Sequence, residues 1–186
     1  MTSLDPIVLT RARRAYERGR LWLGARRVWP IAFLVPAALW LHSASAERIA
    51  LVAATLAIAL VVTGWRGAGW SRGALPGVLG GLPAFFVPYL VAPAGSSCDR
   101  CAHPDAHWST CLALCFAASL TTGVVLAVLA RRDRDPRGFI ASAALTGVLT
   151  AAITCSLAGA AGLGGIALGV LASSLPVLLS PVPRRA

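Results

Sequence analysis

The sequence predicts an all-α, polytopic integral membrane protein, with six transmembrane helices and a short cytoplasmic N-terminal helix. The chain of 186 residues is 57% hydrophobic and only 13% charged, whereas an ordinary soluble domain is about a quarter charged. A soluble protein of this length would have too little polar surface to cover its core, so we expect the apolar excess to face lipid. The other two observations are a series of apolar segments and an uneven distribution of arginine between them.

The apolar segments follow one another along the whole chain. Most approach the length of about 20 residues with which a helix crosses about 30 Å of hydrocarbon. Only helices and closed barrels satisfy their backbone groups in lipid, and long apolar runs without alternation are typical of helices. The predicted spans are residues 28–43, 49–65, 74–92, 109–130, 138–158 and 163–179.

Arginine predicts the orientation of these spans. All seventeen basic residues are arginine, and one set of connections, together with both termini, holds fifteen of them. The opposite set holds only Arg48 and Arg100. Because cytoplasmic loops carry the excess of basic residues, we expect a protein of the bacterial inner membrane with both termini on the cytoplasmic side. The net charge of +10 then reflects topology, and we expect no direct contact with nucleic acid.

The chain therefore divides into a basic amphipathic head, a bundle and a tail. The head is residues 1–27, the six-helix bundle 28–180 with an outer loop at 93–108, and the cytoplasmic tail 181–186. Ala44-Ser45-Ala46 resembles a signal-peptidase site, but the charged region before it is far longer than a usual signal sequence has. We interpret 28–43 as a transmembrane helix.

Small residues in the last two spans predict close helix packing. Gly159, Gly162, Gly165 and Gly169 follow one another at spacings of three and four residues. Small residues at such spacing let two helix backbones approach each other in a membrane. Packing explains these glycines, and we assign them no chemistry.

The head allows two interpretations. Residues 5–27 favour a helix with one apolar side and arginines around the others. Such a helix can rest on anionic lipid headgroups, or it can dock its apolar stripe into a groove on a cytoplasmic protein. It is too short to fold by itself as a catalytic domain.

The stretch CDRCAHPDAHWSTC, residues 98–111, gathers thiols and imidazoles on the outer side of the predicted bundle. Its spacing approaches that of a small zinc knuckle, and tetrahedral zinc or copper would accept such ligands. No cofactor is certain, but zinc or another soft metal ion suits the site. The candidate ligands are Cys98, Cys101, His103, His107 and Cys111.

Oxidation is the alternative, because thiols outside the cytoplasm tend to pair as disulfides. Cys115 and Cys155 lie at similar depth under the predicted outer surface, in the fourth and fifth spans. A disulfide or a shared metal between them is geometrically plausible. Five cysteines are an odd number, so complete pairing leaves at least one thiol.

No convincing catalytic set is present. The seven acidic residues lie mostly in loops, and none lies deep inside a predicted span, where a proton-coupled transporter would be expected to keep one. Cys98-x2-Cys101 does not sit at the helix N-terminus that lowers the thiol pKa in thioredoxin-like sites. We expect that the protein is not an enzyme.

One segment carries a resemblance to a known family. CLALCFAASLTTGVVLAVLARRDRDPRGFIASAALTGVLTAAITC, residues 111–155, joins a Cys-bearing helix to a basic Asp-Pro loop and a small-residue-rich helix that ends near another Cys. With the short head and six spans, this resembles the NrsF-like family of bacterial membrane anti-sigma factors. It covers about a quarter of the chain, and the cluster of Cys98, Cys101, His103 and His107 departs from it.

The resemblance implies an inner-membrane regulator. The head would sequester an extracytoplasmic-function sigma factor and release it when Cys111 or Cys115, with Cys155, senses metal or oxidant. The residues expected to contact the sigma factor are Val8, Ala12, Arg13, Tyr16 and Arg20. The other partners considered are the lipid bilayer and a second copy of the chain. The alternative function is a small membrane carrier or handling protein for soft metal ions of the zinc, copper and mercury class.

Overall fold

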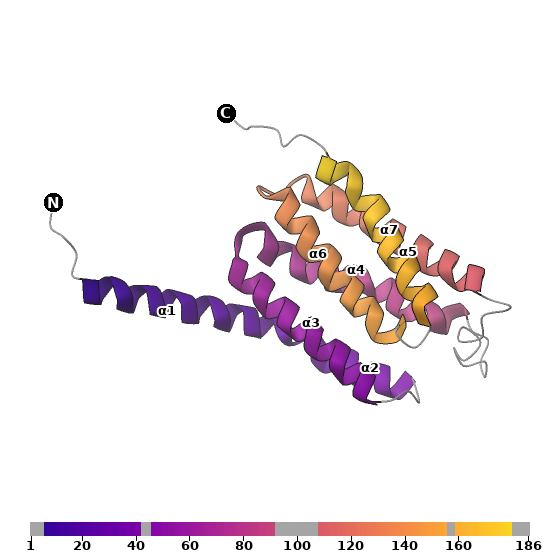
Figure 1. Ribbon diagram of the computed structural model, residues 1–186, viewed down its shortest axis with the longest axis horizontal. Helices are drawn as coiled ribbons and strands as arrows, with labels where there is room; N and C mark the ends of the chain where they lie inside the picture. Colours follow the sequence, from indigo (N-terminus) through magenta and orange to yellow (C-terminus); the bar gives the residue numbers. More distant parts are fainter. Residues whose placement is uncertain (1–5, 42–45, 92–107, 156–158, 180–186) are drawn as a thin grey trace.

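The computed structural model is all α-helical over the residues it describes, which are 6–41, 46–91, 108–155 and 159–179 (Figure 1). Each of the six predicted apolar segments contains a helix, and another helix precedes them. The elements are α1 (Pro6–Ala25), the 3-10 turn η1 (Arg26–Val28), α2 (Ile31–Leu41), α3 (Ala46–Arg66), α4 (Ala68–Val91), α5 (Trp108–Ala130), α6 (Pro136–Cys155) and α7 (Gly159–Leu179).

The length and composition of the helices place the protein in a membrane. Among the described residues, three segments are long and apolar enough to cross one: Ala46–Arg66, Leu112–Ala130 and Pro136–Ile153. Gly164–Pro176, within α7, is a shorter apolar helical segment. Large apolar side chains on α3, such as Leu51 and Ile58, are exposed on the outside of the bundle, as expected of side chains that face lipid.

Local sequence explains two of the helix boundaries. Gly67 separates α3 from α4 with a φ of 70°, a backbone conformation that glycine adopts without the steric cost other residues meet. Asp135 precedes α6, and its Oδ1 accepts the N–H of Gly138 at 3.0 Å. Pro136 then occupies the first helical position, where its missing N–H costs nothing. Asp-Pro therefore fixes the start of α6.

The closest pair of helices is α4 and α6, which lie side by side (Figure 1). A row of glycines at every fourth position of α4 lies against α6, and a Cβ built on Gly81 would come within 2.6 Å of the carbonyl oxygen of Gly147. The hydroxyl of Thr146 lies 2.9 Å from both the Ala74 and the Ser142 carbonyl oxygens. Its single proton can donate either across to α4 or within α6. The row consists of Gly69, Gly73, Gly77 and Gly81.

The second close pair is α5 and α7. A Cβ on Gly165 would come within 2.7 Å of the Leu112 carbonyl oxygen, and one on Gly169 within 2.8 Å of the Phe116 carbonyl oxygen. For these two glycines the predicted close packing is confirmed. Gly164 has open space around it, so a larger side chain would fit at Gly164 but would clash with α5 at Gly165.

The largest buried cluster joins α2, α3, α4 and α6. Phe85 is completely buried, and Leu56 and Ile153 are buried beside it in the same cluster. Through this cluster α3 packs onto the α4–α6 pair, and α2 covers α3. The bundle is thus built from the α4–α6 and α5–α7 pairs, with α2 and α3 along one side.

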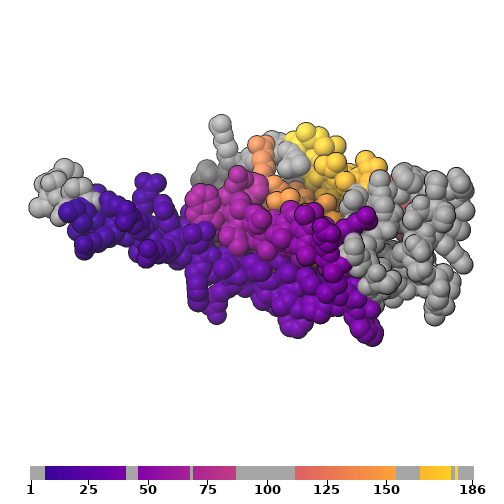
Figure 2. Space-filling view, turned by 60° about the horizontal axis from the view of Figure 1, so that its bottom comes forward, coloured from indigo at the N-terminus to yellow at the C-terminus, as the bar shows by residue number. Residues whose placement is uncertain are grey.

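Helix α1 leaves the bundle. Only its C-terminal part packs on α3, and its N-terminal part extends beyond the end of the bundle (Figure 1). Figure 2 shows the same indigo helix standing clear of the body of the molecule. We call residues 7–19 the arm. It projects from the end at which α3 ends, α4 begins, and α5 turns into α6.

Candidate functional site

The arm carries an exposed apolar stripe. Val8, Ala12 and Tyr16 follow one another at intervals of four residues, which places them on one side of the helix. All three are exposed, Val8 to 53% and Tyr16 to 64%. Trp22 and Leu23 extend the apolar surface toward the bundle and are also exposed. Within the described residues nothing covers this stripe.

The two arginines that sequence reasoning placed with the stripe have other contacts. Arg13 forms an exposed ion pair with Glu17, with 3.0 Å between Nε and Oε1. Arg20 is half-buried, its guanidinium lies 5.5 Å from the centre of the Tyr16 ring, and it also lies against Gly67. Arg20 therefore belongs to the region where α1 joins the bundle, while Val8, Ala12 and Tyr16 belong to the free surface of the arm.

The joint between α1 and the bundle is a crossing of two glycines. A Cβ on Gly64 would come within 2.6 Å of the Cα of Gly24, and one on Gly24 within 2.9 Å of the Val61 carbonyl oxygen. Arg27 adds a hydrogen bond, donating from Nη1 to the Ser71 carbonyl oxygen at the start of α4. The base of α1 is thus fixed to both α3 and α4.

The turn between α5 and α6 is tied to α4 at the same end of the bundle. Nη1 of Arg72 lies 3.3 Å from Oδ2 of Asp133, whose side chain is largely buried. Burial raises the pKa of Asp133, but the backbone N–H of Asp135, the hydrogen bond and charge of Arg72, and the backbone of Arg134 together lower it below its ordinary value of 3.8. Asp133 is therefore ionised at neutral pH and keeps its pair with Arg72.

This end of the bundle is strongly basic, and we call it the basic end. Within the described residues it holds nine arginines and two carboxylates, those of Asp133 and Asp135, besides the arm, which carries Arg11, Arg13, Arg14, Arg18 and Glu17. The described part of the opposite end has Glu47 and Arg48. The nine are Arg20, Arg26, Arg27, Arg66, Arg72, Arg131, Arg132, Arg134 and Arg137.

Of the predicted sensing residues, Cys115 is the one whose side chain the structure describes. It is 1% exposed and belongs to a buried cluster with Ala84, Ala151 and Ile166, which come from α4, α6 and α7. Gly165 of α7 lies directly against it. The thiol therefore sits where four helices meet, and a reagent can reach it only if their packing opens.

The helical register refines the predicted depth of the cysteines. Cys111 precedes Cys115 by four residues in α5, and Cys155 follows Ala151 by four residues at the end of α6. At a rise of about 1.5 Å per residue, each lies roughly 6 Å further from the basic end than the cluster of Cys115 and Ala151. The backbone thus places Cys111 at the depth of Cys155, and Cys115 one turn deeper.

The remaining predicted ligands, Cys98, Cys101, His103 and His107, lie outside the described residues, as do the side chains of Cys111 and Cys155. Within the part of the chain that is described, no three His, Cys, Asp or Glu side chains gather as a metal site. The metal and redox interpretation of the outer stretch therefore stays a prediction.

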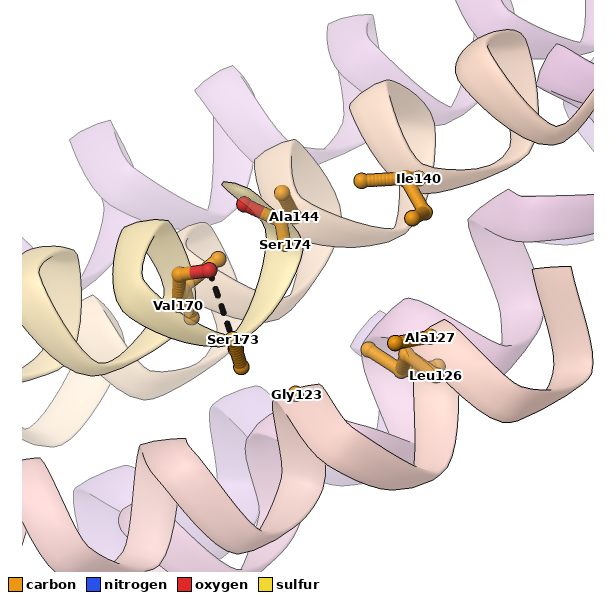
Figure 3. A pocket seen from close by; sticks show the side chains of 8 residues that line it. All are labelled: Gly123, Leu126, Ala127, Ile140, Ala144, Val170, Ser173 and Ser174. Atoms are coloured by element: carbon orange, nitrogen blue, oxygen red, sulfur yellow. Dashed lines mark hydrogen bonds between the residues drawn. The ribbon is translucent and has the colours of Figure 1, made fainter. Parts of the chain in front are cut away.

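Two small cavities lie inside the bundle, each of about 10 Å³, which is about the room one water molecule needs. Figure 3 shows the first, which residues of α5, α6 and α7 line, while the Ser173 hydroxyl donates to the Val170 carbonyl oxygen at 3.0 Å. The second is lined in part by Ser119, whose buried hydroxyl has no hydrogen-bond partner among the described residues. Neither cavity admits an organic substrate. The first is lined by Gly123, Leu126, Ala127, Ile140, Ala144, Val170, Ser173 and Ser174.

Comparisons with family models, curated proteins and solved structures found no match to this chain. What the chain does must therefore be argued from its own residues. The two features that the sequence reasoning missed are the α1–α3 joint and the glycine row of α4. The row has a sequence signal, since its glycines recur every four residues, whereas the joint consists of two isolated glycines far apart in the chain.

Proposed function

We propose that the protein is an inner-membrane anti-sigma regulator, which sequesters an extracytoplasmic-function sigma factor on its cytoplasmic arm and releases it when outer cysteines sense metal or oxidant. In this proposal all six helices from α2 to α7 cross the membrane, and the basic end faces the cytoplasm, as the positive-inside rule favours. In this arrangement the N-terminal helix binds the partner, and the bundle senses the metal or oxidant.

The observation that supports the proposal most is the arm. A helix whose apolar stripe stands in water is stabilised when a partner covers that stripe, and docking into a groove is the usual way in which a protein does this. The arm extends away from the end of the bundle instead of folding across it. A surface in that position is more accessible to a cytoplasmic protein than to the plane of the bilayer.

The bundle offers a physical route from the outer cysteines to the arm. Cys115 lies between helices of both close pairs, α4–α6 and α5–α7, and α4 begins beside Arg27 at the base of α1. A metal or a disulfide at the outer ends of α5 and α6 would favour one arrangement of these pairs over another. Such a ligand regulates the arm only to the extent that it binds the two arrangements with different affinity.

The experiment is co-purification of the full-length chain from its native membrane, followed by identification of bound sigma factors. Replacing the stripe residues Val8 and Tyr16 by serine should abolish the complex. The matched control is Ile7→Ser with Leu21→Ser, two exposed apolar residues of α1 that lie on another side of the helix, and it should retain the complex. Recovery of no sigma factor, or equal loss in both variants, would contradict the proposal.

A further inference from the structure

Three arginines gather where α1 meets the turn between α3 and α4. The crossing of Gly24 and Gly64 brings the end of α1 onto the end of α3. From there the Arg20 guanidinium reaches Gly67, and Arg27 reaches the Ser71 carbonyl oxygen. Arg66, the last residue of α3, lies over the Trp70 ring. We call this group the collar, and it consists of Arg20, Arg27, Arg66 and Trp70.

The arginines of the collar have no direct ion pair within the described residues, since none of the three guanidinium groups has a carboxylate at ion-pair distance. Asp133, which lies at the same end of the bundle, is paired with Arg72, from outside the collar. Asp135 lies beside the Trp70 ring, where both approach Gly138. Three cations around one joint repel each other, and an anion that binds among them relieves that repulsion.

One guanidinium group of the collar lies over an indole. The Cζ of Arg66 lies 4.7 Å from the centre of the Trp70 ring, and a cation in this position is attracted by the face of the ring. A guanidinium group is planar and presents several N–H donors, which can bind a phosphate with two parallel hydrogen bonds.

The position of the collar indicates the source of that phosphate. The candidate span Ala46–Arg66 ends within it, so the collar lies at the depth of the lipid headgroups. Two further indoles, those of Trp29 and Trp65, are exposed at the same level of the structure. Tryptophan and arginine are enriched at this depth because an indole suits the interface, while basic side chains attract anionic headgroups.

We propose that the collar is a binding site for the phosphate of an anionic phospholipid in the leaflet at the basic end. The bound lipid holds the base of α1 at the membrane surface, while the stripe on the arm stays free for a protein. This site is separate from the stripe, and its existence does not depend on which protein docks there.

The test uses the full-length protein in detergent, titrated with phosphatidylglycerol, phosphatidylcholine or inorganic phosphate and observed by native mass spectrometry. The collar variant is R20Q/R66Q, which leaves Arg27 in place because it donates to the α4 backbone. The matched control, R131Q/R132Q, removes the same charge from exposed arginines of the same end. If the collar variant does not fold, R66Q takes its place with R131Q as its control, since both side chains are exposed.

We expect the wild type and the control to retain phosphatidylglycerol in preference to phosphatidylcholine, and the collar variant to bind it about tenfold more weakly or worse. Equal loss in the two variants would overturn the site, because the basic end would then attract lipid only through its total charge. Displacement of the lipid by an equal concentration of inorganic phosphate would also overturn it, as would collar variants that bind lipid normally but lose a co-purifying protein.

Discussion

Gly64→Ala tests whether the glycine crossing holds the base of α1 on α3. A methyl group at this position would lie 2.6 Å from the Cα of Gly24, about 1 Å closer than ordinary van der Waals contact. Because that atom belongs to a helix backbone, the two helices must separate. Overpacking of this kind costs about 1–3 kcal/mol, and alanine recovers up to about 1 kcal/mol through its higher helix propensity.

The net loss of about 1–2 kcal/mol increases the population of the detached joint roughly 5- to 30-fold. Hydrogen–deuterium exchange of the peptide that covers residues 20–28, measured by mass spectrometry in micelles, should accelerate by that factor. The control is Gly19→Ala on the same helix, where a Cβ meets nothing within 4 Å. Because alanine has a higher helix propensity than glycine, Gly19→Ala should slow hydrogen exchange in the arm. Unchanged exchange in Gly64→Ala would refute the crossing.

Three further predictions concern the bundle. Arg72→Met should lower stability by about 0.5 kcal/mol at neutral pH, since Arg72 is 57% exposed. It should also reduce the acid destabilisation that the wild type shows as pH falls through the lowered pKa of Asp133, because the backbone N–H of Asp135 still lowers this pKa in the variant. Equal pH profiles of melting temperature would contradict this. Gly169→Ala should destabilise the fold by about 1–3 kcal/mol, whereas Gly164→Ala, in open space, should not; thermal unfolding in detergent separates the two. In a variant that keeps Cys115 as its one cysteine, a polar maleimide should label the thiol only after denaturation, and rapid labelling in native membranes would show that the four-helix contact is open.

The helices could be predicted from the sequence because their signals are local. Apolar runs, Asp135-Pro136 and the arginine-rich connections each specify an element or a boundary without reference to the rest of the chain. The all-α class is confirmed over the described residues, and three helices long and apolar enough to cross a membrane support the membrane location, whereas the six-span topology stays a prediction. Which helices pack against each other was harder to predict, since an apolar helix is compatible with many neighbouring helices.

The contacts that fix the arm could not be read from the sequence. Gly24 and Gly64 carry no signal until the chain brings them together, and Arg20 looks like any other arginine of the head. The predicted pairing of Cys115 with Cys155 in depth also changes, because the helical register puts Cys111 at the level of Cys155 and Cys115 one turn deeper. Residue spacing determines depth along a helix, whereas the facing of two helices depends on packing across the whole bundle.

The measurement that tests the regulator most directly is the affinity of the full-length chain for its sigma factor, in lipid nanodiscs, with and without a thiol oxidant or a soft metal ion on the outer side. The proposal predicts at least a tenfold loss of affinity, about 1.4 kcal/mol, and no loss when Cys111, Cys115 and Cys155 are replaced by serine. Equal affinity with and without every such agent, in a chain that binds the sigma factor tightly, would contradict it.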